Sequence, residues 1–314
     1  MMRLWKGTFH DTDSYISLVF NTYFKRDNVF VRYEGDTLSA ALLCVPYEFK
    51  IDSKNLNTPL NGMYLCGLAT RPEFRRRGIM AQLMNEAEES IAARGYDMTF
   101  LIPADDHLRE YYKRMGYYNA SYKKISTYIS NPGNRSSELY IYAFRDLIQS
   151  GDTDFIRDIA TWCINVEKHK FTDPCLIHSE RDMLAVISEN ENSIFVSNEP
   201  IDLKYPILTK VVSVVFPEII VDSSGIFNVR ITGLYLNNEN YYFKSGSKEI
   251  KLEEIAEEIC HFYKISKLEF DLANKIKLGR RIGENPYAMV KPISNLQIFF
   301  NNKKPIFEIS LMLD

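Results

Sequence analysis

The run "MYLCGLAT" (residues 63–70) decides the fold, because it is a nearly continuous apolar stretch typical of a strand buried on both faces. The segment "RPEFRRRGIM" (71–80) leads from it into the helical pattern "AQLMNEAEESIAARG" (81–95), in which Gly95 is placed to end the helix. The apolar side chains that recur on one face of this helix are Ile79, Leu83, Ala87 and Ile91. The sequence therefore predicts a buried strand, a turn rich in arginine, and a helix.

The segments on either side of this unit complete an alternating pattern in the first half of the chain. The residue patterns predict a helix at 12–24, strands at 28–35, 38–49 and 97–104, a helix at 107–115, and one long strand or two over 117–129. Asp105 or Asp106 is placed to cap the helix at 107–115, and Gly116 to stop it. Strands that alternate with helices in this way indicate an α/β layer structure.

The second half resembles the first in layout. Turn and polar residues cluster in "SNPGNRSS" (130–137), which we interpret as a linker. After it we expect strands at 138–144, 192–198, 207–216, 227–236, 240–246, 267–272, 287–293 and 306–314, with helices at 152–169, 179–190 and 252–263. This order is typical of a degenerate repeat that lacks the arginine-glycine turn. We therefore predict two domains, residues 1–130 and residues 131–314.

Composition excludes several classes of protein. A chain of 314 residues exceeds the usual size of a single core, which agrees with two domains. The net charge of −3 provides no basic field for nucleic acid. No apolar stretch approaches the roughly 20 residues of a membrane helix, and the start lacks the apolar core of a signal peptide. We expect neither a nucleic acid nor a membrane partner.

The five cysteines indicate a reducing compartment. They are scattered and odd in number, at Cys44, Cys66, Cys163, Cys175 and Cys260. Such spacing fits reduced thiols in a cytoplasmic protein. His169, Cys175 and His178 are the nearest approach to a metal cluster, but no further ligand accompanies them, so we predict no metal site.

The arginine-glycine turn is suited to an anion. A helix start presents unpaired backbone N–H groups and a partial positive charge, and pyrophosphate is a common occupant of such a site after a strand. Gly78 permits close approach of a ligand, and Arg75, Arg76 and Arg77 add charge. A solvent-exposed basic turn is the alternative interpretation.

A tyrosine follows at a position that can serve the same site. Tyr112 stands four residues before Gly116, near the end of the helix that follows the next buried strand. Right-handed crossovers between parallel strands place that helix beside the turn, where a phenol can donate a proton to a leaving group. The alternative is a packing role, since the chain has 20 tyrosines.

Together these two segments resemble the GNAT superfamily of N-acetyltransferases. Arginine-x-x-glycine after a buried strand is similar to the superfamily's acetyl coenzyme A pyrophosphate loop, and "REYYKRMGYY" (109–118) is similar to its tyrosine-x-x-x-glycine-aromatic segment. The sub-pattern most resembles the branch of the enhanced intracellular survival (Eis) acetyltransferases, which carry a second GNAT-like domain without the loop. The resemblance covers roughly the first 130 residues. It implies tandem GNAT-like α/β (α+β) domains, each with a mixed, mostly antiparallel sheet flanked by helices.

The resemblance also implies roles for particular residues. Leu68, Ala69 and Thr70 match the strand end whose backbone contacts the pantetheine arm and the acetyl carbonyl. The residues that match the pyrophosphate loop are Arg75, Arg76, Arg77, Gly78, Ile79 and Met80. Tyr112 matches the general acid near the thioester sulfur. Met80 departs from the pattern, because glycine or alanine is usual there, and its side chain either narrows the groove or packs inward.

A general base is the missing part of the expected site. The strand at 63–70 contains no Glu or Asp, and we interpret Glu73 in the following loop as a solvated charge. In the Eis-like branch the terminal carboxylate reaches the active site, which makes Asp314 a candidate catalytic residue. This chain is too short for that branch's third, sterol-carrier-like domain, and a last strand that ends at the surface is the alternative.

The resemblance implies an N-acetyltransferase that uses acetyl-CoA as cosubstrate and a small-molecule or peptide primary amine as acceptor. Two other functions stay open: an inactive acyl-CoA-binding or sensing protein, and an aminoacyl or peptidyl transferase. We expect the second domain to bind no cofactor. In "KSGSKEIKLEEIAEEIC" (244–260), where its loop should fall, Glu249, Glu253 and Glu254 would repel a pyrophosphate or simply favour the helix dipole.

Overall fold

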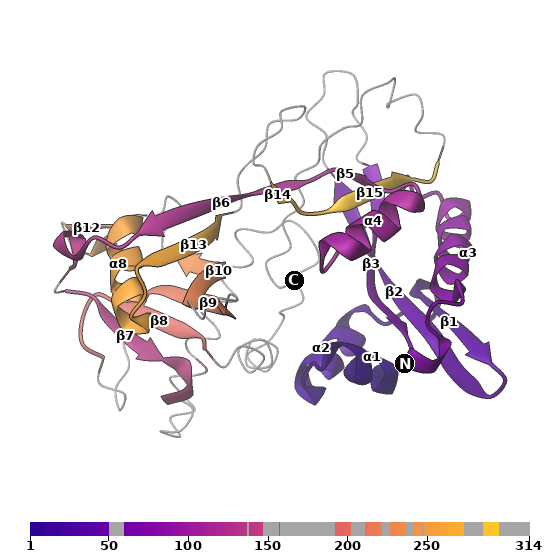
Figure 1. The fold of residues 1–314 in the computed structure, drawn as a ribbon, viewed down its shortest axis with the longest axis horizontal. Helices are drawn as coiled ribbons and strands as arrows, with labels where there is room; N and C mark the ends of the chain where they lie inside the picture. Colours follow the sequence, from indigo (N-terminus) through magenta and orange to yellow (C-terminus); the bar gives the residue numbers. More distant parts are fainter. Residues whose placement is uncertain are drawn as a thin grey trace, which may run out of the picture. The chain divides into compact units, whose positions relative to one another are not determined.

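The computed structural model describes residues 1–49, 60–136, 138–146, 157, 192–201, 211–221, 227–236, 242–245, 248–272 and 285–294. By their mutual contacts the described residues group into two units. The first unit comprises those up to Lys124 together with 285–294, and the second comprises those from Ile125 to 272. Each unit is a sheet with helices, which confirms the expected α/β class (Figure 1).

The first unit is a mixed sheet in which one neighbouring pair of strands is parallel. Its helices are α1 (Met2–Phe9), α2 (Asp13–Tyr23), α3 (Ile79–Ala93) and α4 (Asp106–Arg114), with 3-10 turns η1 (Arg26–Asn28) and η2 (Pro72–Phe74). Its strands are β1 (Val29–Glu34), β2 (Thr37–Phe49), β3 (Leu60–Thr70), β4 (Met98–Leu101), β5 (Tyr118–Asn119) and β15 (Met289–Pro292). The sheet has the order β1-β2-β3-β4-β15-β5, and only β3 and β4 are parallel.

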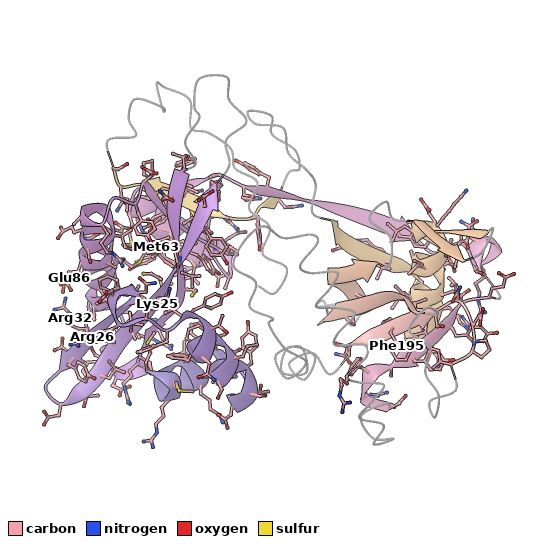
Figure 2. All side chains as sticks on the ribbon, turned by 180° about the vertical axis from the view of Figure 1, so that it is seen from behind. Lys25, Arg26, Arg32, Met63, Glu86 and Phe195 are labelled. Carbon is pink, nitrogen blue, oxygen red and sulfur yellow. The ribbon has the colours of Figure 1, made fainter. Side chains whose placement is uncertain are left out.

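Helices cover both faces of this sheet because apolar side chains alternate along β2 and β3. Leu42 and Met63 belong to the core cluster with α3 and α4, and Figure 2 labels Met63 inside the unit. Ala41 and Ala69 point to the other face, where Leu4 of α1 packs on them. Fully burying a side chain the size of leucine or methionine stabilises the folded protein by about 1.5–3 kcal/mol. The alternation of apolar side chains therefore fixes which face each helix covers.

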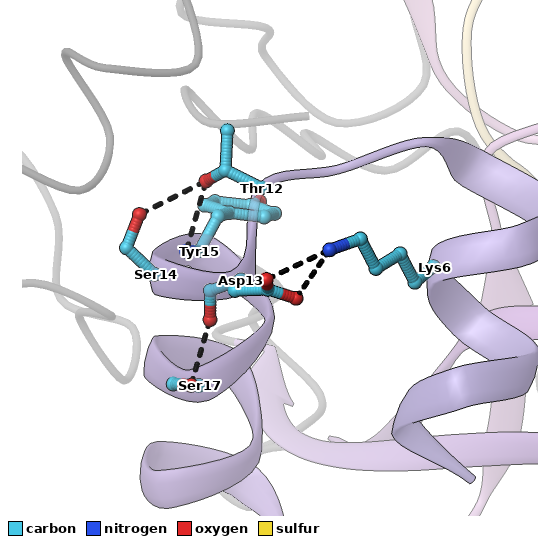
Figure 3. Close-up of polar contacts among 6 residues, drawn as sticks. All are labelled: Lys6, Thr12, Asp13, Ser14, Tyr15 and Ser17. Atoms are coloured by element: carbon cyan, nitrogen blue, oxygen red, sulfur yellow. Dashed lines mark hydrogen bonds and ion pairs between the residues drawn. The ribbon is translucent and has the colours of Figure 1, made fainter.

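Polar contacts at the surface hold the first unit's elements in place. Thr12 caps α2 by accepting a hydrogen bond from the Tyr15 N–H at 3.2 Å, and Lys6 of α1 reaches Asp13 at 2.7 Å (Figure 3). Arg32 of β1 pairs with Glu86 of α3, and Figure 2 shows these two side chains together. A capping residue of this kind contributes about 1 kcal/mol, whereas exposed ion pairs contribute less.

The second unit also contains a mixed sheet. Its strands are β6 (Tyr122–Ile129), β7 (Tyr140–Ala143), β8 (Ile194–Ser197), β9 (Val211–Val221), β10 (Phe227–Leu236) and β13 (Lys267–Leu272), in the order β6-β13-β10-β9-β8-β7. The first three residues of β6, up to Lys124, belong to the first unit. Strands β10 and β13 are parallel, and helix α8 (Leu252–Tyr263) lies between them in the chain. The unit also has 3-10 turn η3 (Pro132–Asn134) and a hairpin of β11 (Tyr242–Ser245) and β12 (Lys248–Lys251). Phe195 of β8 is fully buried in this unit (Figure 2).

One expected strand pairs in the other unit, and the expected linker makes contacts that the sequence pattern did not indicate. Strand β15, expected in the second half, pairs antiparallel with both β4 and β5 of the first unit. The stretch 130–137, which we interpreted as a linker, hydrogen-bonds to α8, since Ser130 and Asn131 both donate to Glu257 at 2.7 and 2.5 Å. Both differences come from long-range pairing, for which local periodicity carries no signal.

Strand β14 (Asn285–Pro286) pairs antiparallel with the start of β6 at Tyr122 and Lys123. The helices expected at 152–169 and 179–190 and the strand expected at 306–314 fall outside the described residues, as do His169, Cys175 and His178, apart from the single residue 157. Within the described ranges, no helix is long and apolar enough to cross a membrane.

Candidate active site

The candidate site begins where β3 and β4 part. The two strands pair in parallel at three positions, from Gly62–Met98 to Tyr64–Phe100. Beyond Tyr64, β3 continues to Thr70 whereas β4 ends at Leu101. Among the described residues, no strand therefore pairs with the β4-facing edge of β3 along its last residues, and we call it the open edge. In open α/β sheets, ligands bind in a crevice at the carboxyl ends of the strands, which is where this opening lies.

A bulge in β3 shapes the open edge. Opposite β2, Ala41 pairs with Ala69 and Leu43 with Cys66, so two residues of β3 stand against one of β2. Gly67 has φ +59°, and a Cβ there would lie 2.0 Å from a ring carbon of Trp5. A glycine in this conformation is typical of a bulge that re-aims the chain. Our sequence prediction did not single out Gly67, although an isolated glycine inside a strand is a signal for such a bulge.

The three strand-end residues that the sequence selected begin within this bulge, at Leu68. Leu68 packs against the core cluster on the α3 side, and Ala69 is buried on the opposite side. Thr70 ends β3 opposite Ala40. Their backbone therefore lies on the open edge, where it faces no residue of β4.

The turn into α3 is a row of backbone N–H groups without partners. Gly78 is the N-cap of α3 at φ +74°, and no side chain caps the helix. Arg76 also has positive φ, at +64°. Within the described part of the chain, the N–H groups of residues 76–81 donate no hydrogen bond. Successive N–H groups around left-handed residues form an anion-binding concavity, and the helix dipole adds to its positive potential.

The arginines of this turn make different contacts. Arg75 Nε donates to the carbonyl of Thr70 at 3.0 Å, and the Arg77 guanidinium lies 5.2 Å from the centre of the Phe74 ring. Arg71, which our prediction missed, donates from Nε to the carbonyl of Leu38 at 2.8 Å. Arg71 and Arg75 thus tie the loop to β2 and β3, whereas Arg77 contacts a ring within the loop.

The first residues of α3 point into the core. Ile79 is buried, and Met80 is partly buried and packs against the same core cluster. The Met80 side chain thus contributes to packing, which answers the question raised by its departure from glycine or alanine. Its backbone N–H is in the unpaired row, so a larger side chain does not remove the donor.

Tyr112 is on the inward face of α4 and is buried. Asp105 caps this helix, with its carboxylate accepting from the Leu108 N–H at 2.7 Å. Burial, chiefly, together with the Tyr111 phenol and the Asp105 carboxylate raises the pKa of Tyr112 to about 12. No described residue hydrogen-bonds to the Tyr112 hydroxyl. A buried phenol of this kind stays protonated at neutral pH and keeps its proton for a ligand.

The turn and the phenol share one face of the sheet. Ile79 at the start of α3, Leu101 at the end of β4 and Tyr112 in α4 all belong to a single core cluster. Figure 1 shows α3 and α4 packed against the sheet of this unit. The structure therefore brings the predicted loop, strand end and tyrosine to the same side of the first unit.

Two acidic residues were considered for the site from the sequence, and the structure describes one of them. Glu73 has a side chain that is 56% exposed and lies 3.8 Å from Arg71, which fits the predicted solvated charge. Asp314 falls outside the described residues, so its catalytic role stays a prediction.

A family model described as an acetyltransferase (GNAT) domain matches residues 1–120, which hold the loop, the open strand and Tyr112. Residues 1–120 form a GNAT domain. The match identifies these residues as an acyltransferase domain. No curated protein matches the sequence.

Solved structures extend the likeness beyond the GNAT domain. The chain is similar to a GCN5-related N-acetyltransferase from Anabaena variabilis (11% identity), a probable N-acyltransferase from Enterococcus faecalis (12%) and Eis1 from Mycobacterium abscessus (8%). Each comparison has a TM-score of 0.50 and covers 93% of this chain and 69% of the other. At these identities the likeness shows a shared fold. It confirms the expected resemblance to GNAT proteins, an Eis protein included.

Proposed function

We propose that the protein is an N-acetyltransferase that moves an acetyl group from acetyl-CoA to a primary amine of a small molecule or peptide. The observation that carries this proposal is the row of unpaired N–H groups over residues 76–81, beside an open strand edge. A pyrophosphate on these groups directs the pantetheine arm along the open edge of β3 toward Tyr112. The residues that would hold the cosubstrate are Leu68, Ala69, Thr70, Arg75, Arg76, Arg77, Gly78, Ile79 and Met80.

The reaction forms one bond and breaks another. The neutral amine nitrogen attacks the thioester carbonyl carbon, and the carbonyl oxygen becomes an oxyanion. Backbone N–H groups on the open edge of β3 are the donors available to this oxyanion. The C–S bond then breaks, the electron pair leaves with sulfur, and the nitrogen loses a proton. The products are an amide and a thiol.

Tyr112 acts on the departing sulfur in this proposal. An ordinary thiol has a pKa of about 8.5, whereas the pKa of Tyr112 is about 12. The phenol therefore stabilises the developing thiolate as a hydrogen-bond donor. The proton that the amine nitrogen loses passes from its acceptor to the sulfur, which gives the thiol. We assign the acceptance of the amine proton to the carboxylate of Asp314, either directly or through water.

The alternative is a protein that binds acyl-CoA without turning it over. The apolar strand beside the site lacks a carboxylate, which favours that alternative, and a buried phenol with its proton available favours catalysis. The buried thiols of Cys44 and Cys260 support a place in the cytoplasm.

A thiol-release assay with acetyl-CoA and a panel of primary amines tests the proposal. Acyltransfer requires thiol release that depends on both the enzyme and the amine, with the acetylated product seen by mass spectrometry. Calorimetry with acetyl-CoA is run in parallel. Micromolar binding without turnover on any amine would establish the binding protein instead, and absence of binding would overturn both.

A further inference from the structure

Glu88 is a buried carboxylate that has no role in the proposed acetyl transfer. It lies in the middle of α3 with 6% of its surface exposed. Its oxygens accept hydrogen bonds from the Tyr117 hydroxyl at 2.6 Å and from Lys291 Nζ at 2.5 Å. Burying a charge is costly unless it is paired and hydrogen-bonded, so these contacts make the carboxylate tolerable in the core.

The network around Glu88 joins four separate parts of the first unit. The Tyr117 hydroxyl also lies 2.9 Å from Thr99 Oγ1 of β4, and Lys291 of β15 lies 5.8 Å from the centre of the Tyr117 ring. Tyr117 is 3% exposed, and burial together with Glu88 raises its pKa well above the usual value. Tyr117 is thus a neutral donor held between α3, β4 and β15.

Tyr117 also contacts Tyr112 through both its backbone and its ring. Its N–H donates to the carbonyl of Tyr112 at 3.1 Å, and the two rings lie 6.0 Å apart with an angle of 61° between their planes. Tyr112 is in the last turn of α4, which ends at Arg114. Helix ends fray, so the orientation of Tyr112 depends on what holds the chain just beyond the helix.

We propose that Tyr117, held by Glu88, Thr99 and Lys291, is a positioning residue for Tyr112. The inference rests on the proposed function, since it concerns the phenol that faces the departing sulfur. When the Tyr117 hydroxyl is removed, the ring remains but its anchor to α3 and β4 is lost. The Tyr112 hydroxyl then samples positions away from the sulfur. Misplacement by about 1 Å can cost about 100-fold in rate, so a partial loss of order is expected to cost about tenfold.

A double-mutant cycle tests the proposal. Tyr117→Phe is expected to lower kcat about tenfold and to leave the KM for acetyl-CoA within about twofold, because the pyrophosphate turn is untouched. In a Tyr112→Phe background, the same substitution is expected to change kcat by less than about twofold, since the group it positions is absent. Equal losses in both backgrounds, or no loss in either, would overturn the proposal.

A second pair of variants separates positioning from loss of stability. Ile91→Val removes one buried methylene from α3, one turn from Glu88, and is expected to destabilise the unit without changing kcat. Lys291→Met breaks the other anchor of Glu88 and is expected to lower kcat as Tyr117→Phe does. If Ile91→Val lowers kcat as much as these variants at equal loss of thermal stability, the effect is structural and the proposal fails.

A measurement that needs no turnover distinguishes failure of this inference from failure of the proposed function. Fluorotyrosine placed at position 112 gives one 19F resonance. Tyr117→Phe is expected to shift and narrow it toward the value of a mobile ring, whereas Tyr33→Phe, at an exposed position of β1, leaves it in place. An unchanged resonance in the Tyr117→Phe variant refutes the positioning role even if no amine is ever acetylated.

Discussion

The starts of α3 and α8 occupy the same topological position in the two units and offer opposite chemistry. Each helix connects two parallel strands that pair at three positions, Gly62 to Tyr64 with β4 and Val229 to Ile231 with β13. In each unit the earlier strand also has a register shift against its antiparallel neighbour. The backbone arrangement is therefore alike, and what differs is the chain that enters the helix.

The difference lies in the N-cap and first turn. Gly78 is the N-cap of α3 in the left-handed conformation, and the first turn of α3 has no acidic residue. Lys251, the last residue of β12, is the N-cap of α8 in an extended conformation. Glu253 and Glu254 occupy the first turn of α8 and line a cavity of about 610 Å³ with Lys251 and residues 133–136. The comparison teaches that topology supplies a helix start in both units, and that a few residues decide whether it can hold a pyrophosphate. We propose that the second unit is a GNAT-like domain without a cofactor.

The largest effect is expected from giving α3 the acidic character of α8. Gly78→Asp places a carboxylate among the unpaired N–H groups, and like charges about 4 Å apart near a protein surface repel by about 4 kcal/mol. Affinity for acetyl-CoA should fall about 1,000-fold in calorimetry. Gly35→Asp is the matched control, because Gly35 also has positive φ and open space around its Cβ position. Equal affinity of the two variants for acetyl-CoA would show that the start of α3 does not bind the pyrophosphate, and the contrast with α8 would then have no functional meaning.

The second-largest effect is expected on kcat, from removing the Tyr112 hydroxyl. Tyr112→Phe should lower kcat about 100-fold, the lower end of what a positioned proton donor contributes. Affinity for acetyl-CoA should stay within a few-fold, because the turn into α3 is intact. Tyr111→Phe serves as the control on the same helix. Greater damage from Tyr111→Phe would assign the proton donor to the other phenol.

A smaller effect is expected from the bulge in β3. Gly67→Ala forces a Cβ against Trp5 and a non-glycine residue into positive φ, so the first unit should lose about 2 kcal/mol of stability. Denaturant unfolding measures this loss. Gly95→Ala separates the two causes, because Gly95 has φ +84° but nothing within 4 Å of its Cβ position. If both variants lose the same free energy of unfolding, the loss comes from the positive φ alone and the contact with Trp5 contributes nothing.

The smallest effect is expected in the second unit. Calorimetry should give one acetyl-CoA per chain, and Glu253→Gln combined with Glu254→Gln should change neither that ratio nor the affinity. The extended N-cap of α8 still lacks the row of N–H groups that α3 presents. A second bound molecule in the wild-type chain or in this variant would refute the proposal that the second unit binds no cofactor.

Much of the site could be predicted because its parts are local in the sequence. A strand, a turn and a helix over 63–95 predict an anion-binding turn with no knowledge of the rest of the chain, and right-handed crossovers place the helix of Tyr112 beside it. Asp105, rather than Asp106, caps α4, and only the structure decides between adjacent carboxylates.

Other parts escaped prediction because they depend on pairing between distant residues. Lys291 meets Glu88 across 203 positions, and β15 lies between β4 and β5. Gly67 was within the quoted strand, but its meaning depends on Trp5, which approaches from α1. Periodicity reports which face of an element is apolar and carries no information about which element covers it.

The insertion of β15 between β4 and β5 has a consequence for synthesis on the ribosome. The first unit's sheet cannot close until Met289 has emerged, although its other strands end at Asn119. At about 5–20 residues per second, the roughly 170 residues between them take about 10–35 s to make. During that interval the nascent GNAT domain presents β4 as an open edge, which makes it a natural client for a chaperone that shields unpaired strands.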